Sequence, residues 1–315
     1  MIRYYTLLFV VFIVSACHKD EKIFIPDQTH LLNSSYLLSR ISDAPLSYLL
    51  ALKEGKTLFR GPKNTLIEIP YQSLRDSSGT IINGEIKLEF NEFAGEKRNL
   101  LSSPETINNE GLIDCSKIIY LKFTQQGKKL QFATPINVYL PAEKTDKNTA
   151  KDLYESENAT DWVLKTDLQT NYLAQDLVVN NEDSSVKIYG YKLVLDKAKS
   201  WYCVGSSLKN NINHFTSICL TANQNENSKN SLVYFISENN KSVIKLTSTL
   251  AVEPFCRKIL SPVNPIIGHI VIISYFGGEN YYFGMTNAVI GEDTMVNIKT
   301  VPTSIEKIKE ALMML

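Results

Sequence analysis

The sequence predicts a mainly-β protein with two antiparallel β-sandwich domains and a short amphipathic helix at the C-terminus. A signal peptide and a tether precede these domains. The 315 residues are enough for two domains, and 16 tyrosines and 13 phenylalanines favour strands over helices. Short segments that alternate apolar and polar residues between turns are typical of antiparallel sandwiches. We place the first sandwich at 46–165 and the second at 166–315.

The first 16 residues have the parts of a signal peptide. Arg3 supplies a positive charge, and an unbroken apolar run, Leu7–Val14, follows it. This run is far shorter than the ~20 residues of a membrane-spanning helix, so a transmembrane anchor is not expected. The small residues Ser15 and Ala16 then precede Cys17. We therefore expect residues 1–16 to be removed.

The segment Val14–Cys17 resembles the lipobox of bacterial lipoproteins. The resemblance implies cleavage before Cys17, diacylglycerol on its thiol and a further acyl chain on its amine, which palmitate would label. Several acyl chains anchor a protein stably, because each buried CH₂ contributes ~0.8 kcal/mol. The alternative is an ordinary secretory signal that happens to be followed by a cysteine.

The residues after Cys17 carry a second resemblance. Lys19, Asp20 and Glu21 resemble the surface-export signal of Bacteroidota lipoproteins. The resemblance implies a lipid-anchored protein on the outer membrane that faces outward from the cell. The alternative is a solvated, charged tether. We assign residues 17–45 to the lipidated cysteine and tether, of which the apolar stripe around Tyr36–Leu38 can be helical.

Several short strands are predicted in the first domain. Charged and apolar residues alternate in Glu85–Phe90, which predicts a strand with one buried and one solvated face. Asn83-Gly84 just before it predicts a hairpin turn. Ile118–Phe123 also alternates, and Ile136–Leu140 lies between two prolines, as edge strands often do.

This part of the chain resembles a β-sandwich module of Bacteroidota surface lipoproteins, which is itself similar to the sandwiches of ankyrin and netrin-receptor tails. The resemblance rests on Leu66–Pro70, Leu74–Asp76, Gly79, Asn83–Phe90 and the turn Gln125–Lys128. It covers about a third of the chain. It implies an architecture and no catalytic residues.

The second half continues with strand-like segments and ends in a helix. Val186–Leu195, Leu232–Ile236 and His269–Ser274 are separated by turns, which again predicts an antiparallel sandwich. Near the C-terminus, Thr303 and Glu306 have the spacing of a capping box. The apolar face of the predicted helix consists of Ile305, Ile308, Leu312 and Leu315.

Charge and cysteine content restrict the class of protein. Lysine plus arginine equals aspartate plus glutamate, 33 each, without a dense basic run, so nucleic acid is not an expected partner. No two cysteines have CxxC spacing. If Cys17 carries lipid, four cysteines remain: Cys115, Cys203, Cys219 and Cys256. They allow three disulfide pairings, and free buried thiols are the alternative.

No motif for enzyme chemistry is present. The four histidines, His18, His30, His214 and His269, have neither HxH nor HExxH spacing, and GxSxG is absent. We therefore expect no metal, no cofactor and no enzymatic activity. The alternative is a glycan-active hydrolase whose carboxylates converge only in the fold.

One aromatic segment is a candidate for ligand contact. Tyr275–Phe283 holds five aromatic residues around a tight turn. If exposed, Tyr275, Tyr281 and Tyr282 could stack on sugar rings or contact a protein. The alternative, which we favour, is that alternate rings fill the core. The sequence thus predicts an exported lipoprotein, attached to a membrane through Cys17, that serves as a binding or structural component of the cell surface and contacts a glycan or a protein.

Overall fold

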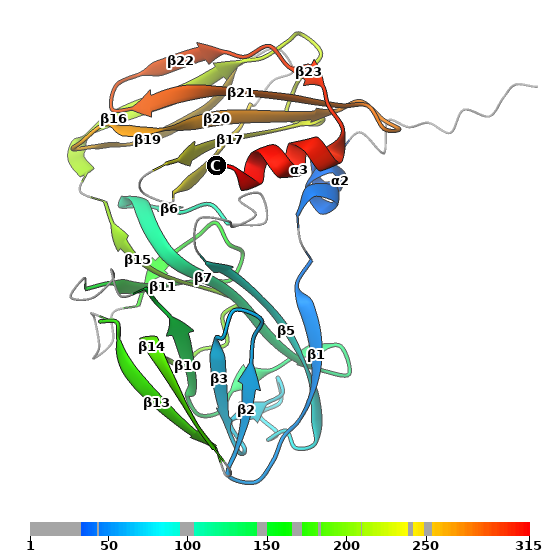
Figure 1. Ribbon diagram of the computed structural model, residues 1–315, viewed down its shortest axis with the longest axis vertical. Coiled ribbons are helices and arrows are strands. Elements are labelled where there is room, and N and C mark those ends of the chain that lie inside the picture. The colour runs from blue at the N-terminus through cyan, green and yellow to red at the C-terminus, as the bar shows by residue number, and fades with distance from the viewer. Residues whose placement is uncertain are drawn as a thin grey trace, which may run out of the picture.

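The computed structural model describes residues 33–42, 44–94, 104–143, 150–165, 172–181, 184–208, 210–238, 242–248 and 254–315. These residues form two β-rich lobes, stacked along the long axis in Figure 1. The predicted mainly-β class and the C-terminal helix are confirmed. The signal peptide, Cys17 and Lys19-Asp20-Glu21 lie outside the described residues.

The first lobe consists of two large sheets. The eight-stranded sheet has the order β1 (Leu46–Ala51), β5 (Glu85–Ala94), β7 (Gly111–Gln125), β15 (Trp201–Ser207), β11 (Asp152–Ser156) and β12 (Val163–Leu164), with β6 (Ile107–Asn108) and β8 (Lys128–Lys129) beside β7. The five-stranded sheet has the order β13 (Gln175–Asn181), β14 (Ser184–Leu195), β10 (Ile136–Pro141), β3 (Leu66–Pro70) and β2 (Lys56–Arg60). A small ribbon joins β4 (Leu74–Arg75) to β9 (Gln131–Phe132).

The core of the first lobe follows from the period-two pattern. Ile86, Leu88 and Phe90 alternate inward from β5 and are buried, while Lys87 is exposed and Glu89 half-buried on the opposite face. The inward residues of both sheets form one apolar cluster. Each face of β5 therefore points to the side that the alternation predicts.

The strand pairing places the division between the lobes later in the chain than residue 165. β14, which we expected in the second sandwich, pairs with β10, and β15 lies between β7 and β11. The five-stranded sheet thus uses strands up to Leu195, and the eight-stranded sheet uses strands up to Ser207. The expected boundary was wrong because pairing with a distant strand leaves no local signal in the sequence.

The second lobe is a smaller sandwich. Its three-stranded sheet has the order β19 (Phe255–Pro262), β16 (Asn210–Thr221) and β22 (Thr294–Asn297), and β22 is parallel to β16. Its five-stranded sheet has the order β18 (Val243–Leu246), β17 (Ser231–Ser237), β20 (Ile266–Tyr275), β21 (Tyr281–Ile290) and β23 (Val301–Pro302). Apolar residues from both sheets form the core between them.

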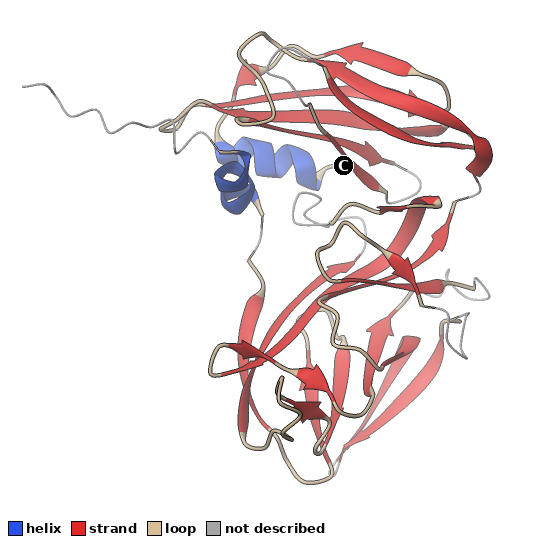
Figure 2. Ribbon diagram, turned by 180° about the vertical axis from the view of Figure 1, so that it is seen from behind, coloured by secondary structure: helices blue, strands red, loops and turns tan. Residues whose placement is uncertain are grey.

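Two helices cover the outer face of the five-stranded sheet (Figures 1 and 2). Leu37 and Ile41 of α2 (Ser34–Ile41) are buried there, so this part of the expected tether is a helix packed on the second lobe. α3 (Ile305–Met313) buries Ile305, Ile308 and Leu312. Its cap is Ser304 and not Thr303, because the Ser304 hydroxyl accepts the N–H of Lys307.

All four cysteines outside the N-terminal segment form disulfides. Cys115 of β7 bonds to Cys203 of β15 in the first lobe. Cys219 of β16 bonds to Cys256 of β19 in the second. Of the pairings that the sequence left open, the structure selects one, and the free-thiol alternative does not hold.

Candidate functional site

The outer face of the eight-stranded sheet combines aromatic and charged side chains. Ile119 and Leu121 of β7 point into the core, so Tyr120 and Lys122 between them point outward. Trp201 of β15 lies directly opposite Tyr120 in the register. Neighbouring strands therefore place these side chains on one solvent-facing surface.

Aromatic rings form the centre of this surface. The Tyr120 and Trp201 ring centroids are 5.0 Å apart, and Trp201 stacks on the buried ring of Phe93 at 5.8 Å. Tyr120 and Trp201 are half-buried. We call this pair the Tyr120–Trp201 shelf. Both residues lie on paired strands, and each ring packs against another aromatic ring.

Glu89 of β5 binds three groups at one side of the shelf. Its carboxylate lies 3.1 Å from Lys87 Nζ and 3.3 Å from Lys122 Nζ, and it accepts the Tyr120 hydroxyl at 3.4 Å. Partial burial raises the pKa of Glu89, but the two lysines outweigh burial and leave the pKa below its usual value. Burial and Glu89 raise the pKa of Tyr120 to about 12, so its hydroxyl stays a donor at neutral pH.

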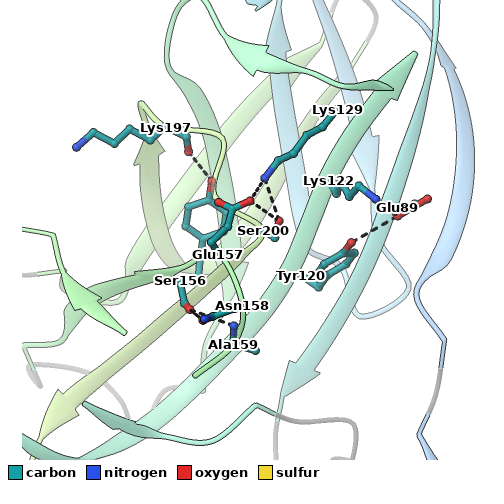
Figure 3. Close-up of polar contacts among 11 residues, drawn as sticks. Glu89, Tyr120, Lys122, Lys129, Ser156, Glu157, Asn158, Ala159, Lys197 and Ser200 are labelled. Atoms are coloured by element: carbon teal, nitrogen blue, oxygen red, sulfur yellow. Dashed lines mark hydrogen bonds and ion pairs between the residues drawn. The ribbon is translucent and has the colours of Figure 1, made fainter. Parts of the chain in front are cut away.

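A second polar cluster lies on the other side of the shelf. Lys129 of β8 pairs with Glu157 and donates to the Ser200 hydroxyl at 3.1 Å, and Ser200 donates to Glu157 at 3.3 Å. Figure 3 shows Lys129, Glu157 and Ser200 converging beside Tyr120. Glu157 also contributes to the raised pKa of Tyr120. Tyr120 thus lies between two carboxylates, each paired with lysine.

Two surface hollows adjoin the shelf. One of about 530 Å³ is lined by Leu49, Lys87, Glu89 and Lys122 among others, and one of about 390 Å³ by Lys129, Glu157 and Lys197 among others. The shelf and the hollows form an aromatic platform with hydrogen-bonding groups at its rim. Such a platform fits a ligand with an apolar face and several hydroxyls, as a sugar ring has.

The tyrosines predicted to contact a ligand lie elsewhere, and two of the three are buried. Tyr275 and Tyr281 stack at 5.1 Å beneath the helices, where Tyr36 of α2 contacts Tyr275 at 5.4 Å. Tyr282 is half-exposed and packs edge-on against Phe276. Burial removes Tyr275 and Tyr281 as ligand contacts, because the docked α2 takes the place that a ligand would occupy.

The histidines in the described segments are not brought together. His269 Nε2 lies 2.7 Å from the Glu238 carboxylate, and His214 is exposed on β16. No cluster of His, Cys, Asp and Glu suitable for a metal is found among the described residues. Sequence reasoning missed the shelf, although the alternation in Ile118–Phe123 already placed Tyr120 and Lys122 on the solvated side.

The fold and this surface define a class: a two-lobe, mainly-β, disulfide-bonded protein with a polar–aromatic sheet face. Within the described residues, no helix is both long and apolar enough to cross a membrane. Compared with family models, curated proteins and solved structures, the chain matches none of them.

Proposed function

We propose that the protein is an exported lipoprotein, anchored through lipid on Cys17 at the cell surface, that binds a saccharide on the Tyr120–Trp201 shelf without converting it. The observation that carries the export is the cysteine pairing. Both disulfides together use every cysteine except Cys17. Disulfides persist in oxidising compartments outside the cytosol, and the single remaining cysteine is the one that follows the signal-like segment.

The position of α2 limits how far the second lobe can lie from the proposed anchor. α2 packs on the second lobe, and only residues 18–33 separate it from Cys17. That chain spans at most ~60 Å when fully extended. With lipid on Cys17, α2 would lie within ~60 Å of the membrane, and the shelf is on the other lobe. The export signal proposed at Lys19, Asp20 and Glu21 would place this lobe outside the cell.

Binding is favoured over hydrolysis by the state of the carboxylates. A glycosidase needs one carboxyl with a raised pKa as the general acid. The lysines hold the pKa of Glu89 below its usual value, and Glu157 is ion-paired with Lys129. Both acids are thus arranged to accept hydrogen bonds from hydroxyls. A hydrolase remains the second candidate, because two carboxylates lie on either side of Tyr120.

A glycan array with the fragment from residue 22 onward tests the proposal. We expect binding that Trp201→Ala reduces about tenfold or more, because a stacking ring is lost. Tyr282→Ala, at a half-exposed tyrosine on the other lobe, serves as the matched control. No bound glycan, or equal loss in both variants, contradicts the saccharide proposal. Shortened products that disappear in Glu89→Gln would support the hydrolase instead.

A further inference from the structure

A second cavity lies where the two lobes meet, away from the Tyr120–Trp201 shelf. It has a volume of about 570 Å³ and is lined by β16 and β19 of the second lobe. The first lobe contributes Thr160–Val163 and the β6–β7 hairpin. This volume is within the range of small-molecule sites, which often lie between domains.

The charged groups of the cavity favour an anion. Arg257 is half-buried, and its side chain has no hydrogen bond or ion pair with any residue in the described part of the chain. Lys258 lies beside it in sequence and also lines the cavity. The only lining carboxylate among the described residues is Asp161, which accepts a hydrogen bond from Asn158 at 2.6 Å. A guanidinium without a protein partner is suited to bidentate binding of a carboxylate.

The cavity also exposes apolar surface. Phe215 is 51% exposed and Val163 is 67% exposed, although both line the same concave surface. The Lys258 ammonium lies 5.0 Å from the Phe215 ring centroid, on the same face of the sheet. Arg257 lies on the other face of β19, and the cavity is lined by residues from both faces of this strand. Exposed apolar groups in a cavity, next to convergent polar groups, are typical of ligand sites.

Other polar groups complete the lining. Asn109, Thr160 and Asp161 offer amide, hydroxyl and carboxylate groups to a ligand. A suitable ligand therefore carries a carboxylate, an apolar ring face and several hydroxyls. These three properties occur together in a hexuronic acid.

We propose that the lobe-junction cavity binds a hexuronic acid residue of an acidic saccharide, with its carboxylate on Arg257 and its ring against Phe215. This proposal uses a different surface from the shelf and holds whether or not the shelf binds a sugar. Because Val163 and Asp161 belong to the first lobe and Arg257 and Phe215 to the second, the ligand contacts both lobes.

The test is calorimetric titration of the full chain, purified in detergent, with trigalacturonate. The fully methyl-esterified trisaccharide is the matched ligand, since it keeps the rings and loses the charge. We expect the ester to bind about tenfold more weakly or not at all. Arg257→Gln should cause a similar loss and Arg257→Lys a smaller one, because lysine keeps the charge without the bidentate geometry. Phe215→Ala should also weaken binding.

Control variants separate this site from its alternatives. Arg75→Gln removes an equal charge at an exposed position of the first lobe and should leave binding unchanged. Trp201→Ala should also leave it unchanged. Equal binding of acid and ester, no binding of the acid, or equal loss in Arg75→Gln and Arg257→Gln overturns the proposal. Loss confined to Trp201→Ala overturns it too and assigns the acid to the shelf. Thermal melts of each variant establish that it is folded.

Discussion

Cys219 of β16 and Cys256 of β19 are directly opposite residues, with Cα atoms 4.2 Å apart, and their disulfide joins the two strands. Cys256 also lines the lobe-junction cavity, next to Arg257. The bond therefore fixes the strand that carries the proposed anion-binding residue. Edge strands such as β19 have one hydrogen-bonded neighbour for most of their length and benefit most from such a link.

Removing this disulfide should destabilise the second lobe. Because it closes a long loop, with a sequence separation of 37, the double variant Cys219→Ser/Cys256→Ser should lose about 2–4 kcal/mol of unfolding free energy. Urea denaturation of the oxidised proteins measures this loss. Thr221→Ser, an exposed substitution on the same strand, is the control. A double variant as stable as the oxidised wild type contradicts the prediction.

The contribution of Glu92 to stability should be less favourable at neutral than at acid pH. Its side chain is 6% exposed, and neither carboxylate oxygen has a regular hydrogen-bond partner. Burial raises the pKa of Glu92 above 4.5, and the nearby Thr65 hydroxyl, Lys117 and Lys63 offset this only in part. The folded state thus holds the proton more tightly than the unfolded chain. The stability that protonated Glu92 contributes is present below about pH 4.5 and is lost as the pH rises through the folded pKa.

The variant Glu92→Gln tests this sign. At pH 7 it should raise the unfolding free energy by about 1 kcal/mol, because it removes a buried charge, and at pH 4 it should change it much less. Urea denaturation at both pH values gives the comparison. Glu85→Gln, exposed on the same strand, should have little effect at either pH. Destabilisation by Glu92→Gln at pH 7 would show that the charged form is favoured in the fold.

The docking of α2 leads to a third prediction. Leu37 is fully buried against the second lobe, so Leu37→Ala should cost about 2–5 kcal/mol and make α2 accessible to protease. Leu49→Ala removes the same atoms from a side chain that is 70% exposed, and it should change stability by less than about 0.5 kcal/mol. Limited proteolysis and thermal melts measure both effects. Equal behaviour of the two variants would mean that α2 does not stay on the lobe.

The alternation of apolar and polar residues predicted individual strands and their buried faces, because this pattern lies within a single strand. The alternation in Glu85–Phe90 identified β5 and its buried face. Asn83-Gly84 predicted a hairpin turn, but the chain only bends at Gly84, which has φ +85, while Asn83 lacks the positive φ that such a turn requires. The segment just before Asn83 does not form a hairpin with β5, which pairs with β1 and β7. Ile81 forms a bridge with Arg75 instead, because long-range contacts decide which strands meet.

The candidate site could likewise be predicted only in part from the sequence. Tyr120 and Lys122 could be assigned to the solvated face from the period of β7 alone. Trp201, which lies 81 residues after Tyr120, completes the shelf only because β15 inserts between β7 and β11. The lobe-junction cavity depends in turn on how both lobes meet. No spacing within the sequence encodes either arrangement.

The N-terminal segment gives the last prediction, which separates anchoring from export. Cys17→Ala should remove palmitate labelling and release the protein to the soluble fraction, since the lipid is the proposed anchor. Replacing Lys19, Asp20 and Glu21 with alanines should keep the lipid and the membrane fraction but abolish labelling of intact cells by an impermeant reagent. The variant Glu306→Ala/Lys307→Ala/Glu310→Ala changes the same kinds of charge on exposed positions of α3 and should label normally. Unchanged surface labelling after the Lys19–Glu21 replacement would leave that segment as a charged tether, and palmitate labelling of Cys17→Ala would place the anchor elsewhere.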